Sequence, residues 1–312
     1  MPWKAGYTTS NERSLSDDDL RWPEGRRAAF SVIVDLDPIC SPEGLKPESF
    51  QTPEAYFGMH DGLDAVRTTL DGHGVKATFV ASAVTAVCFP QVLTSLARDG
   101  HEIATTGLAR ENTETLDPDE EGRRIALATA QMAEVLGAAP KGWFALPRAA
   151  DRYAVGGISP AMAGLLKAAG YAYLGGGLAD DIPYYHVIDA DRGAALLALP
   201  YYYHYDDQFF LMFPARGTGL EHADVLGRNW TRQLKAQTAR GRCTSIVVHP
   251  HLIGWGHRWR MFDDLIARAA ETGGLWAATG ADLASHWATE YPAGAILNLK
   301  PSIWQDYPDS LS

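Results

Sequence analysis

Short apolar runs alternate with amphipathic segments from about Arg27 onward. This alternation predicts parallel strands joined by helical crossovers, so the expected fold class is α/β. Most of the apolar runs are rich in β-branched or aromatic residues and are bounded by turn residues, as is typical of buried strands. The seven expected strands are 29–36, 75–80, 101–105, 142–146, 195–203, 244–249 and 275–278. This number of strands favours a barrel.

The clearest helix signal lies between Asp117 and Gly137. Asp117 suits the N-cap, Pro118 suits the first turn, and a glutamate at the third helical position predicts a capping box. Gly137 suits the C-terminal end. Two further helices are expected to open at Ser159 and at Thr279.

Two stretches, 38–58 and 175–188, resist regular assignment. Long loops at the carboxyl ends of barrel strands are where such folds place their sites, so both are candidate substrate walls. The chain contains no internal repeat and no low-complexity linker. We therefore expect an N-terminal arm (1–20), one barrel domain (21–290) and a C-terminal tail (291–312).

The amino-acid composition limits the classes of molecule that the protein is expected to bind. A hydrophobic fraction of 46% and a charged fraction of 21% are those of an ordinary globular protein. The net charge of −11 disfavours nucleic acid, which requires a basic surface. The absence of a long apolar run and the polar N-terminus predict a cytoplasmic protein with a small-molecule substrate and no membrane partner. The three scattered cysteines fit no disulfide framework or zinc ribbon.

Two carboxylates end the first expected strand. Asp35 and Asp37 are spaced i, i+2, which puts both on one side of an extended chain. Such a pair can act as a general base and a metal ligand, or as two acid/base groups with separated pKa values. The alternative is a solvated strand end where Asp37 and Pro38 begin a turn.

A histidine ends a later strand in the same way. The apolar run 245–248 delivers His249, and His251 follows two residues on. A histidine titrates near neutral pH and can donate a proton to a leaving group. Although an isolated histidine is more often structural, the His-Pro-His sequence at a strand end favours a functional role.

The run from Gly100 to Arg110 resembles the second motif of the polysaccharide-deacetylase (NodB-like, carbohydrate esterase) superfamily, in its branch of small-molecule amidohydrolases such as PuuE-type allantoinases and cyclic imidases. Asp35-Leu-Asp37 resembles the first motif of that family and Val248-His249-Pro the last. Further matches are Gly142-Trp143 with Pro147-Arg148, 179–184, 200–207 and 275–279. The resemblance spans roughly residues 20–290 and implies a distorted (β/α)7 barrel of the polysaccharide deacetylase type, with its site at the carboxyl ends of the strands.

The sequence departs from the family at the metal site. The family carries two metal-binding histidines where this chain has Thr106 and Arg110. Neither is a zinc ligand, because a guanidinium brings positive charge and no lone pair. We therefore expect no cofactor, and the alternative is a rebuilt divalent-metal (zinc) site from Asp37, His249 and His251, or one that uses His204. Arg110 could pair with the two aspartates, hold a substrate oxygen, or point to solvent.

The resemblance also assigns other roles. It makes His101 structural, and it puts Phe144 where the family usually has an arginine, while an arginine occurs instead at Arg148. Aromatic residues in loops after strands favour a pocket for planar ligands. The expected substrate-binding residues are Thr106, Arg110, Trp143, Arg148, Tyr184, Tyr201, Asp207, His251 and Trp255.

Three functions follow from these residues. The first is a metal-independent hydrolase of a non-peptide C–N bond in a small cyclic or aromatic amide, with Asp35 as base, His249 as acid, Asp37 beside them, and Arg110 or Thr106 at the oxyanion. The second is a lyase or isomerase that uses the same acid/base pair. The third is a non-catalytic binding protein. The resemblance further implies a homo-oligomer, a dimer or a tetramer.

Overall fold

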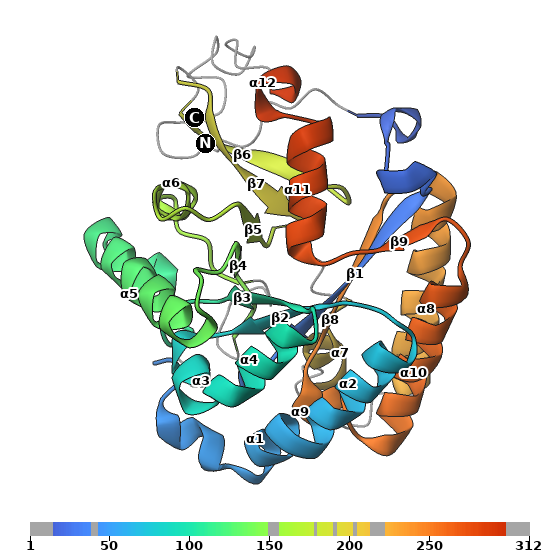
Figure 1. Ribbon diagram of the computed structural model, residues 1–312, viewed down its shortest axis with the longest axis horizontal. Coiled ribbons are helices and arrows are strands. Elements are labelled where there is room, and N and C mark those ends of the chain that lie inside the picture. The colour runs from blue at the N-terminus through green and yellow to red at the C-terminus, as the bar shows by residue number, and fades with distance from the viewer. Residues whose placement is uncertain are drawn as a thin grey trace, which may run out of the picture.

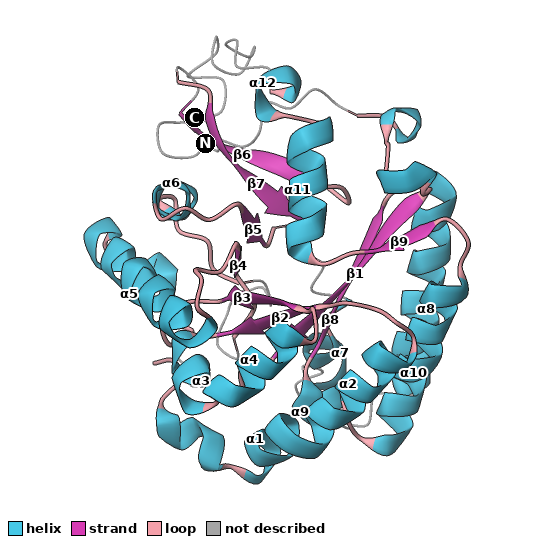
Figure 2. Cartoon of the chain, viewed as in Figure 1, coloured by secondary structure: helices cyan, strands magenta, loops and turns pink. Residues whose placement is uncertain are grey.

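The computed structural model describes residues 15–38, 43–148, 156–177, 180–189, 192–201, 205–212 and 222–297. Its strands form one sheet in the order β6-β7-β5-β4-β3-β2-β1-β8, and β9 also pairs with β1 (Figure 2). The strands are β1 (Ala28–Asp35), β2 (Thr78–Ala81), β3 (Glu102–Thr105), β4 (Gly142–Phe144), β5 (Tyr173–Gly175), β6 (Tyr184–Asp189), β7 (Ala194–Leu199), β8 (Cys243–Val248) and β9 (Leu275–Ala277).

All neighbouring strands are parallel except β6 and β7, which form an antiparallel pair. The segment after β7 then reaches the far edge of the sheet, where Asp206 forms a parallel bridge with Val247 of β8. This bridge joins the segment that follows β7 to β8 near the carboxyl end of β8. The arrangement is that of a distorted α/β barrel.

Helices surround the sheet (Figure 1). They are α1 (Pro53–Phe57), α2 (Leu63–Gly72), α3 (Ala83–Cys88), α4 (Pro90–Arg98), α5 (Pro118–Leu136), α6 (Met162–Ala168), α7 (Asp207–Met212), α8 (Ala223–Arg240), α9 (Pro250–Ile253), α10 (Gly256–Glu271), α11 (Gly280–Glu290) and α12 (Ala293–Ile296). A π-helical turn, η4 (Gly58–Gly62), joins α1 to α2. Helices α2, α8 and α10 pack together over β1 and β8.

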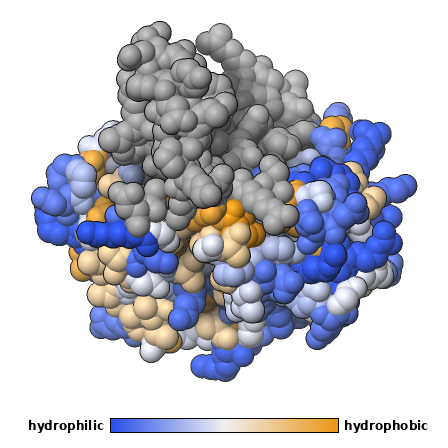
Figure 3. All heavy atoms as spheres, turned by 90° about the horizontal axis from the view of Figure 1, so that it is seen from above, coloured by the Kyte–Doolittle hydropathy of each residue, from blue (hydrophilic) through white to orange (hydrophobic). Residues whose placement is uncertain are grey.

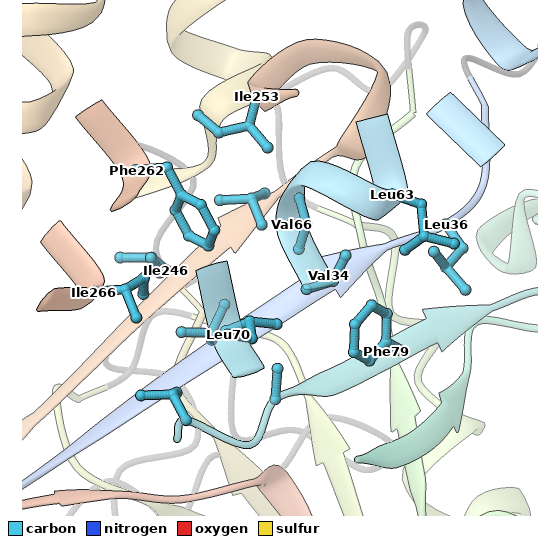
Figure 4. Close-up of a cluster of buried hydrophobic side chains, with 14 of the residues drawn as sticks. Val34, Leu36, Leu63, Val66, Leu70, Phe79, Ile246, Ile253, Phe262 and Ile266 are labelled. Carbon is cyan, nitrogen blue, oxygen red and sulfur yellow. The ribbon is translucent and has the colours of Figure 1, made fainter. Parts of the chain in front are cut away.

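Strand β1 is buried along its whole length and divides two cores. Its even-numbered residues, such as Val32 and Val34, pack against α2 and α10, and Figure 4 shows this cluster. Its odd-numbered residues, such as Ala29 and Ile33, pack in the other cluster. Because side chains alternate along a strand, Asp35 and Asp37 continue the odd-numbered face. The hydrophobic pattern of β1 thus aims both carboxylates at the barrel interior.

Strand β8 repeats this alternation. Ile246 and Val248 belong to the cluster with α10, whereas Cys243 and Val247 belong to the other. His249 directly follows β8 and continues the second set, so it lies on the same face as Asp35. The sequence pattern of two neighbouring strands therefore brings an acid and a base together.

The seven expected strands are all present with small shifts, and the structure adds two, β5 and β6. The expectation that 175–188 is irregular is wrong for its second half, because β6 pairs with β7 there. Consecutive buried tyrosines, Tyr184 and Tyr185, hide the alternation that would have marked this strand. At α5 the N-cap Asp117 is confirmed, but its capping box is not formed, and Glu120 pairs instead with Arg124.

Residues on both sides of the expected domain boundaries touch one another. The Arg21 amide donates to the Tyr291 hydroxyl at 2.6 Å, and the Tyr291 hydroxyl donates to the Asp19 carbonyl at 3.0 Å. The boundaries at 20 and 290 stay predictions. In the part of the chain that the structure describes, no helix is both long enough and apolar enough to cross a membrane. On the face in Figure 3, hydrophilic and apolar residues are interspersed.

Candidate active site

Asp35 and His249 lie side by side where β1 and β8 end. The two strands are paired in register, with Val34 opposite Val248, so the next residue of each strand falls at the same level. His249 Nε2 lies 3.2 Å from Asp35 Oδ2, and both side chains are buried. The structure thus brings together the base and the acid that the sequence predicted from two separate strands.

Arg110 points into this site. Its Nη1 lies 2.6 Å from Asp35 Oδ2 and 3.4 Å from Asp37 Oδ2, and its Nη2 donates to the Pro147 carbonyl at 2.9 Å. Arg110 has a φ of 56°, in the left-handed region that non-glycine residues seldom adopt. Such a conformation persists only where the surroundings enforce it. Of the three placements that the sequence left open for Arg110, the structure has the one that pairs it with the two aspartates.

Asp37 is held by the start of α3. Its Oδ1 accepts hydrogen bonds from the Ser82 amide and hydroxyl, both at 3.0 Å, and from the Thr85 hydroxyl at 2.5 Å. Ser82 is also the N-cap of α3. The sequence analysis did not single out Ser82 or Thr85, because a Ser-x-x-Thr run at a helix start suggests only capping.

Two aspartates and a tyrosine support His249 from the other side. Asp207 accepts a hydrogen bond from the His249 amide and lies 2.7 Å from its Nδ1. Asp206 Oδ1 lies 3.8 Å from the same Nδ1, and its Oδ2 accepts from the Tyr201 hydroxyl at 2.7 Å. Asp207 and Tyr201 were expected to bind substrate, but their polar atoms are turned toward His249 and Asp206. Asp206 was missed, and its only signal was its position beside Asp207.

These contacts shift the pKa values of Asp35, Asp37 and His249 in different directions. Burial would raise the pKa of Asp35, but the charges of Arg110 and His249 lower it to about 2. Burial and the charge of Asp35 raise the pKa of Asp37, against the opposing effects of Arg110 and Thr85. Burial would lower the pKa of His249, but Asp206, Asp207 and Asp35 hold it well above its ordinary value. At neutral pH the site therefore contains an ionised Asp35 between two cations.

The site does not fit the metal that the family resemblance implies. A divalent ion there would need lone pairs at positions 106 and 110, where this chain has a hydroxyl and a guanidinium. The Arg110 guanidinium instead brings its positive charge to Asp35 and Asp37. Asp37 Oδ1 already accepts three hydrogen bonds.

The rebuilt ligand set of Asp37, His249 and His251 is also not the one that the structure groups. Among the described residues, the atoms of Asp206, Asp207 and His249 lie within 4.8 Å of one another, as ligands of one ion would. Their hydrogen bonds to each other, to Tyr201 and to the Gln208 amide account for this grouping without an ion. His204 lies outside the described residues.

Four expected substrate-binding residues line one small pocket beside the carboxyl ends of β3 and β4. They are Thr106, Arg110, Trp143 and Arg148. Trp143 is fixed by an edge-on contact with Tyr171, with 5.4 Å between ring centroids. Phe144, expected to make this wall apolar, also lines the pocket and packs against Tyr173.

Other expected residues lie away from this pocket. The Tyr184 hydroxyl donates to the Gly176 carbonyl at 3.2 Å. Trp255 is 49% exposed and stacks on Phe57, with ring centroids 4.1 Å apart. His101 is structural, since its buried ring accepts from the Ala77 amide and packs edge-on against Phe79.

Residues 57–174 match the family model described as polysaccharide deacetylase. A structure from Mycobacterium smegmatis assigned as a polysaccharide deacetylase is 25% identical, with a TM-score of 0.73 over 87% of this chain and 93% of that chain. PuuE allantoinase is 20% identical, with a TM-score of 0.74 over 90% of this chain and 95% of that chain. None of the curated proteins compared with the chain matches it. The family model matches the middle of the chain, and together with these structures it confirms the resemblance to polysaccharide deacetylases that was read from the motifs.

The same comparisons confirm the distorted (β/α)7 barrel. At the level of the family, they support a hydrolase of C–N amide bonds. A CE4 family pseudoenzyme from Bacillus anthracis also shares the fold, at 10% identity and a TM-score of 0.50 over 82% of this chain and 65% of that chain.

Proposed function

We propose that this protein hydrolyses a non-peptide C–N bond in a small cyclic amide or imide. Catalysis is by acid–base chemistry from Asp35 and His249, without a resident metal. The observation that carries the proposal is the buried contact of 3.2 Å between His249 Nε2 and Asp35 Oδ2, with Arg110 against the same carboxylate oxygen. A base, an acid and a fixed cation thereby converge on one point at the carboxyl ends of the strands.

The reaction begins with the substrate carbonyl beside Arg110. Asp35 takes a proton from water as the water oxygen bonds to the carbonyl carbon, and the guanidinium of Arg110 stabilises the negative oxygen that forms. The Nε2 proton of His249 then passes to the departing nitrogen as the C–N bond breaks. The products are a carboxylic acid and an amine or amide.

The contact between Asp35 and His249 also allows both residues to regain their starting protonation states after turnover. After turnover Asp35 holds the proton from water and His249 has lost one. Because their facing atoms are 3.2 Å apart, the proton can return directly from Asp35 to His249.

The substrate must be activated. A divalent metal would contribute several kcal/mol of transition-state stabilisation as a Lewis acid, and a guanidinium that is already paired with two carboxylates contributes less. Strained or doubly acylated nitrogens are better leaving groups than simple amides. This favours cyclic imides and hydantoins over N-acyl amides and over polysaccharides.

The direct test is an assay of the purified protein against cyclic imides, hydantoins and N-acyl amides, with Asp35→Asn as the inactive control. Turnover of the ring substrates by the native protein, lost in Asp35→Asn, would support the proposal. Binding without turnover would favour a non-catalytic protein, as in the pseudoenzyme neighbour. A product that retains every ring bond would favour an isomerase.

The pH dependence of kcat/KM tests the acid. His249 donates only when protonated, and the nearby carboxylates raise its pKa, so activity should persist into alkaline pH and fall as pH rises through that pKa. Asp35 titrates at about 2, so it should produce no acid limb above about pH 3. Asp206→Asn removes a charge that raises the His249 pKa, and the alkaline limb should therefore move to lower pH. Asp64→Asn, at an exposed position on α2, is the control. An alkaline limb that stays in place in Asp206→Asn would remove His249 as the acid.

The expectations of a homo-oligomer and of a cytoplasmic location stay predictions.

A further inference from the structure

His251 is a buried polar side chain that the proposed catalytic steps do not use. It lies two residues after His249, is 7% exposed, and its ring centroid is 5.5 Å from that of His249. Its Nε2 is fully buried and has no hydrogen-bond partner among the described residues. Buried polar atoms are almost always paired, so this nitrogen needs a hydrogen-bond partner that the described residues do not supply.

The fold holds His251 in this position. The π-helical turn η4 packs directly onto α9, which carries His251, and a Cβ atom added to Gly58 would lie 2.8 Å from the Cβ of His251. A Cβ atom added to Gly62 would collide with the Pro250 carbonyl oxygen. Both glycines are therefore required for this close approach. π-Helical turns occur frequently at functional sites.

His251 lines a small pocket that is otherwise apolar. Its other lining residues are Leu36, Pro38, Ala55, Gly58, Met59 and Pro250. Leu36 faces away from Asp35 and Asp37, and the pocket is linked to the site through the contact of the His251 ring with that of His249. The Trp255 indole N–H donates to the His251 carbonyl at 3.1 Å, and this hydrogen bond helps to fix α9.

The environment determines what His251 can bind. Burial and the charge of His249 lower the pKa of His251 to about 3, so its ring is neutral and offers a lone pair. An apolar pocket favours an uncharged ligand. Thr106, Arg110 and Arg148, which line the other small pocket of the site, carry hydrogen-bond donors suited to a carbonyl. The N–H group of an imide or hydantoin would then still need a hydrogen-bond acceptor.

We propose that His251 is a specificity-determining residue that accepts a hydrogen bond from the ring N–H of an uncharged cyclic imide or hydantoin. This inference rests on the proposed function, because it assigns a position next to His249 to the N–H group of the proposed substrate. With its N–H directed at His251 in the ring plane, the ring nitrogen can receive the His249 proton on one face of the ring, perpendicular to the N–H bond. A substrate with a methyl group on this nitrogen would meet the apolar wall and leave His251 unpaired.

The test compares His251→Leu and His251→Gln with the native protein, using hydantoin, succinimide and their N-methyl analogues. The native protein should prefer each N–H compound over its N-methyl analogue by about 5- to 150-fold in kcat/KM, since the loss of a buried hydrogen bond costs about 1–3 kcal/mol. His251→Leu should raise KM for the N–H compounds and reduce the preference to less than about 3-fold. His251→Gln should retain part of it.

Thermal unfolding separates binding from a structural role. Because His251→Leu replaces an unpaired buried nitrogen with an apolar group, the melting temperature should stay the same or rise by about 2–4 °C. His257→Leu, at an exposed position on α10, is the matched control and should change neither property. A melting temperature that falls by several degrees in His251→Leu, with the N–H preference unchanged, would overturn the inference.

Calorimetric binding of the same four compounds to the Asp35→Asn variant distinguishes this inference from the proposed function. If the native protein turns over none of them but Asp35→Asn and the native protein bind hydantoin better than N-methylhydantoin, the hydrolase proposal fails and the role of His251 stands. If both proteins bind the N–H and N-methyl compounds equally, or bind neither, the role of His251 is refuted.

Discussion

Replacing Arg110 with methionine is expected to destabilise the protein by about 3–5 kcal/mol, the usual cost of removing one partner from a buried ion pair. Arg110 contacts Asp35 and Asp37, and all three side chains are buried. Without the guanidinium, two carboxylates would face each other in the protein interior with one fewer compensating charge. Urea unfolding of Arg110→Met and of the native protein measures the difference.

A second substitution identifies the cause. Asp37→Asn in the Arg110→Met background removes one of the two buried carboxylate charges that repel each other and should recover part of the lost stability. Lysine at position 110 should be intermediate, because it retains the charge but lacks the fork that reaches both Asp37 and the Pro147 carbonyl. Arg228→Met, at an exposed position on α8, is the control. A cost below about 0.5 kcal/mol for Arg110→Met, which is typical of surface substitutions, would show that Arg110 is not paired in the protein interior.

The second large effect is on activity. His249→Gln should lower kcat/KM for the ring substrates by about 10²–10⁴-fold, the usual contribution of a positioned general acid or base. Glutamine can keep a hydrogen bond to Asp207 but cannot transfer a proton. Steady-state kinetics provides the measurement, with His257→Gln, at an exposed position on α10, as the control.

The double variant Asp35→Asn/His249→Gln tests whether the two residues act as one unit. Because each is useless to the reaction without the other, the double variant should be little worse than either single variant. Multiplicative losses would indicate two independent roles, and activity that survives in His249→Gln would refute acid–base catalysis by this pair.

Much of the fold was predictable because β1 and β8 carry clean two-residue alternation that ends in Asp35 and His249. Parallel strands place their carboxyl ends together, so the sequence alone put these groups at one edge. Strand β6 was not predictable in this way, because its tyrosines are buried on both faces of a hairpin at the sheet edge.

The details of the site depended on contacts between residues far apart in the chain. Arg110 and Asp35 are 75 residues apart in the sequence, and Asp206 and His249 are 43 residues apart. Local sequence patterns carry no information about contacts over such separations. The direction of the Arg110 side chain depends on its left-handed backbone, which few arginines adopt. Ser82 and Thr85 looked like ordinary helix-capping residues, and only the structure shows that they also hold Asp37.

The central claim is that the Arg110 guanidinium takes the place of a metal ion in this site, and the metal content of the native protein tests it most directly. Elemental analysis by mass spectrometry, with a chelator-treated activity assay, should find zinc and manganese far below one ion per chain and turnover that the chelator does not change. The variant Thr106→His/Arg110→His, which restores the family's histidines, should gain about one zinc ion per chain and serves as the positive control. One zinc or manganese ion per native chain, with activity lost on chelation and regained when the metal is returned, would contradict the account.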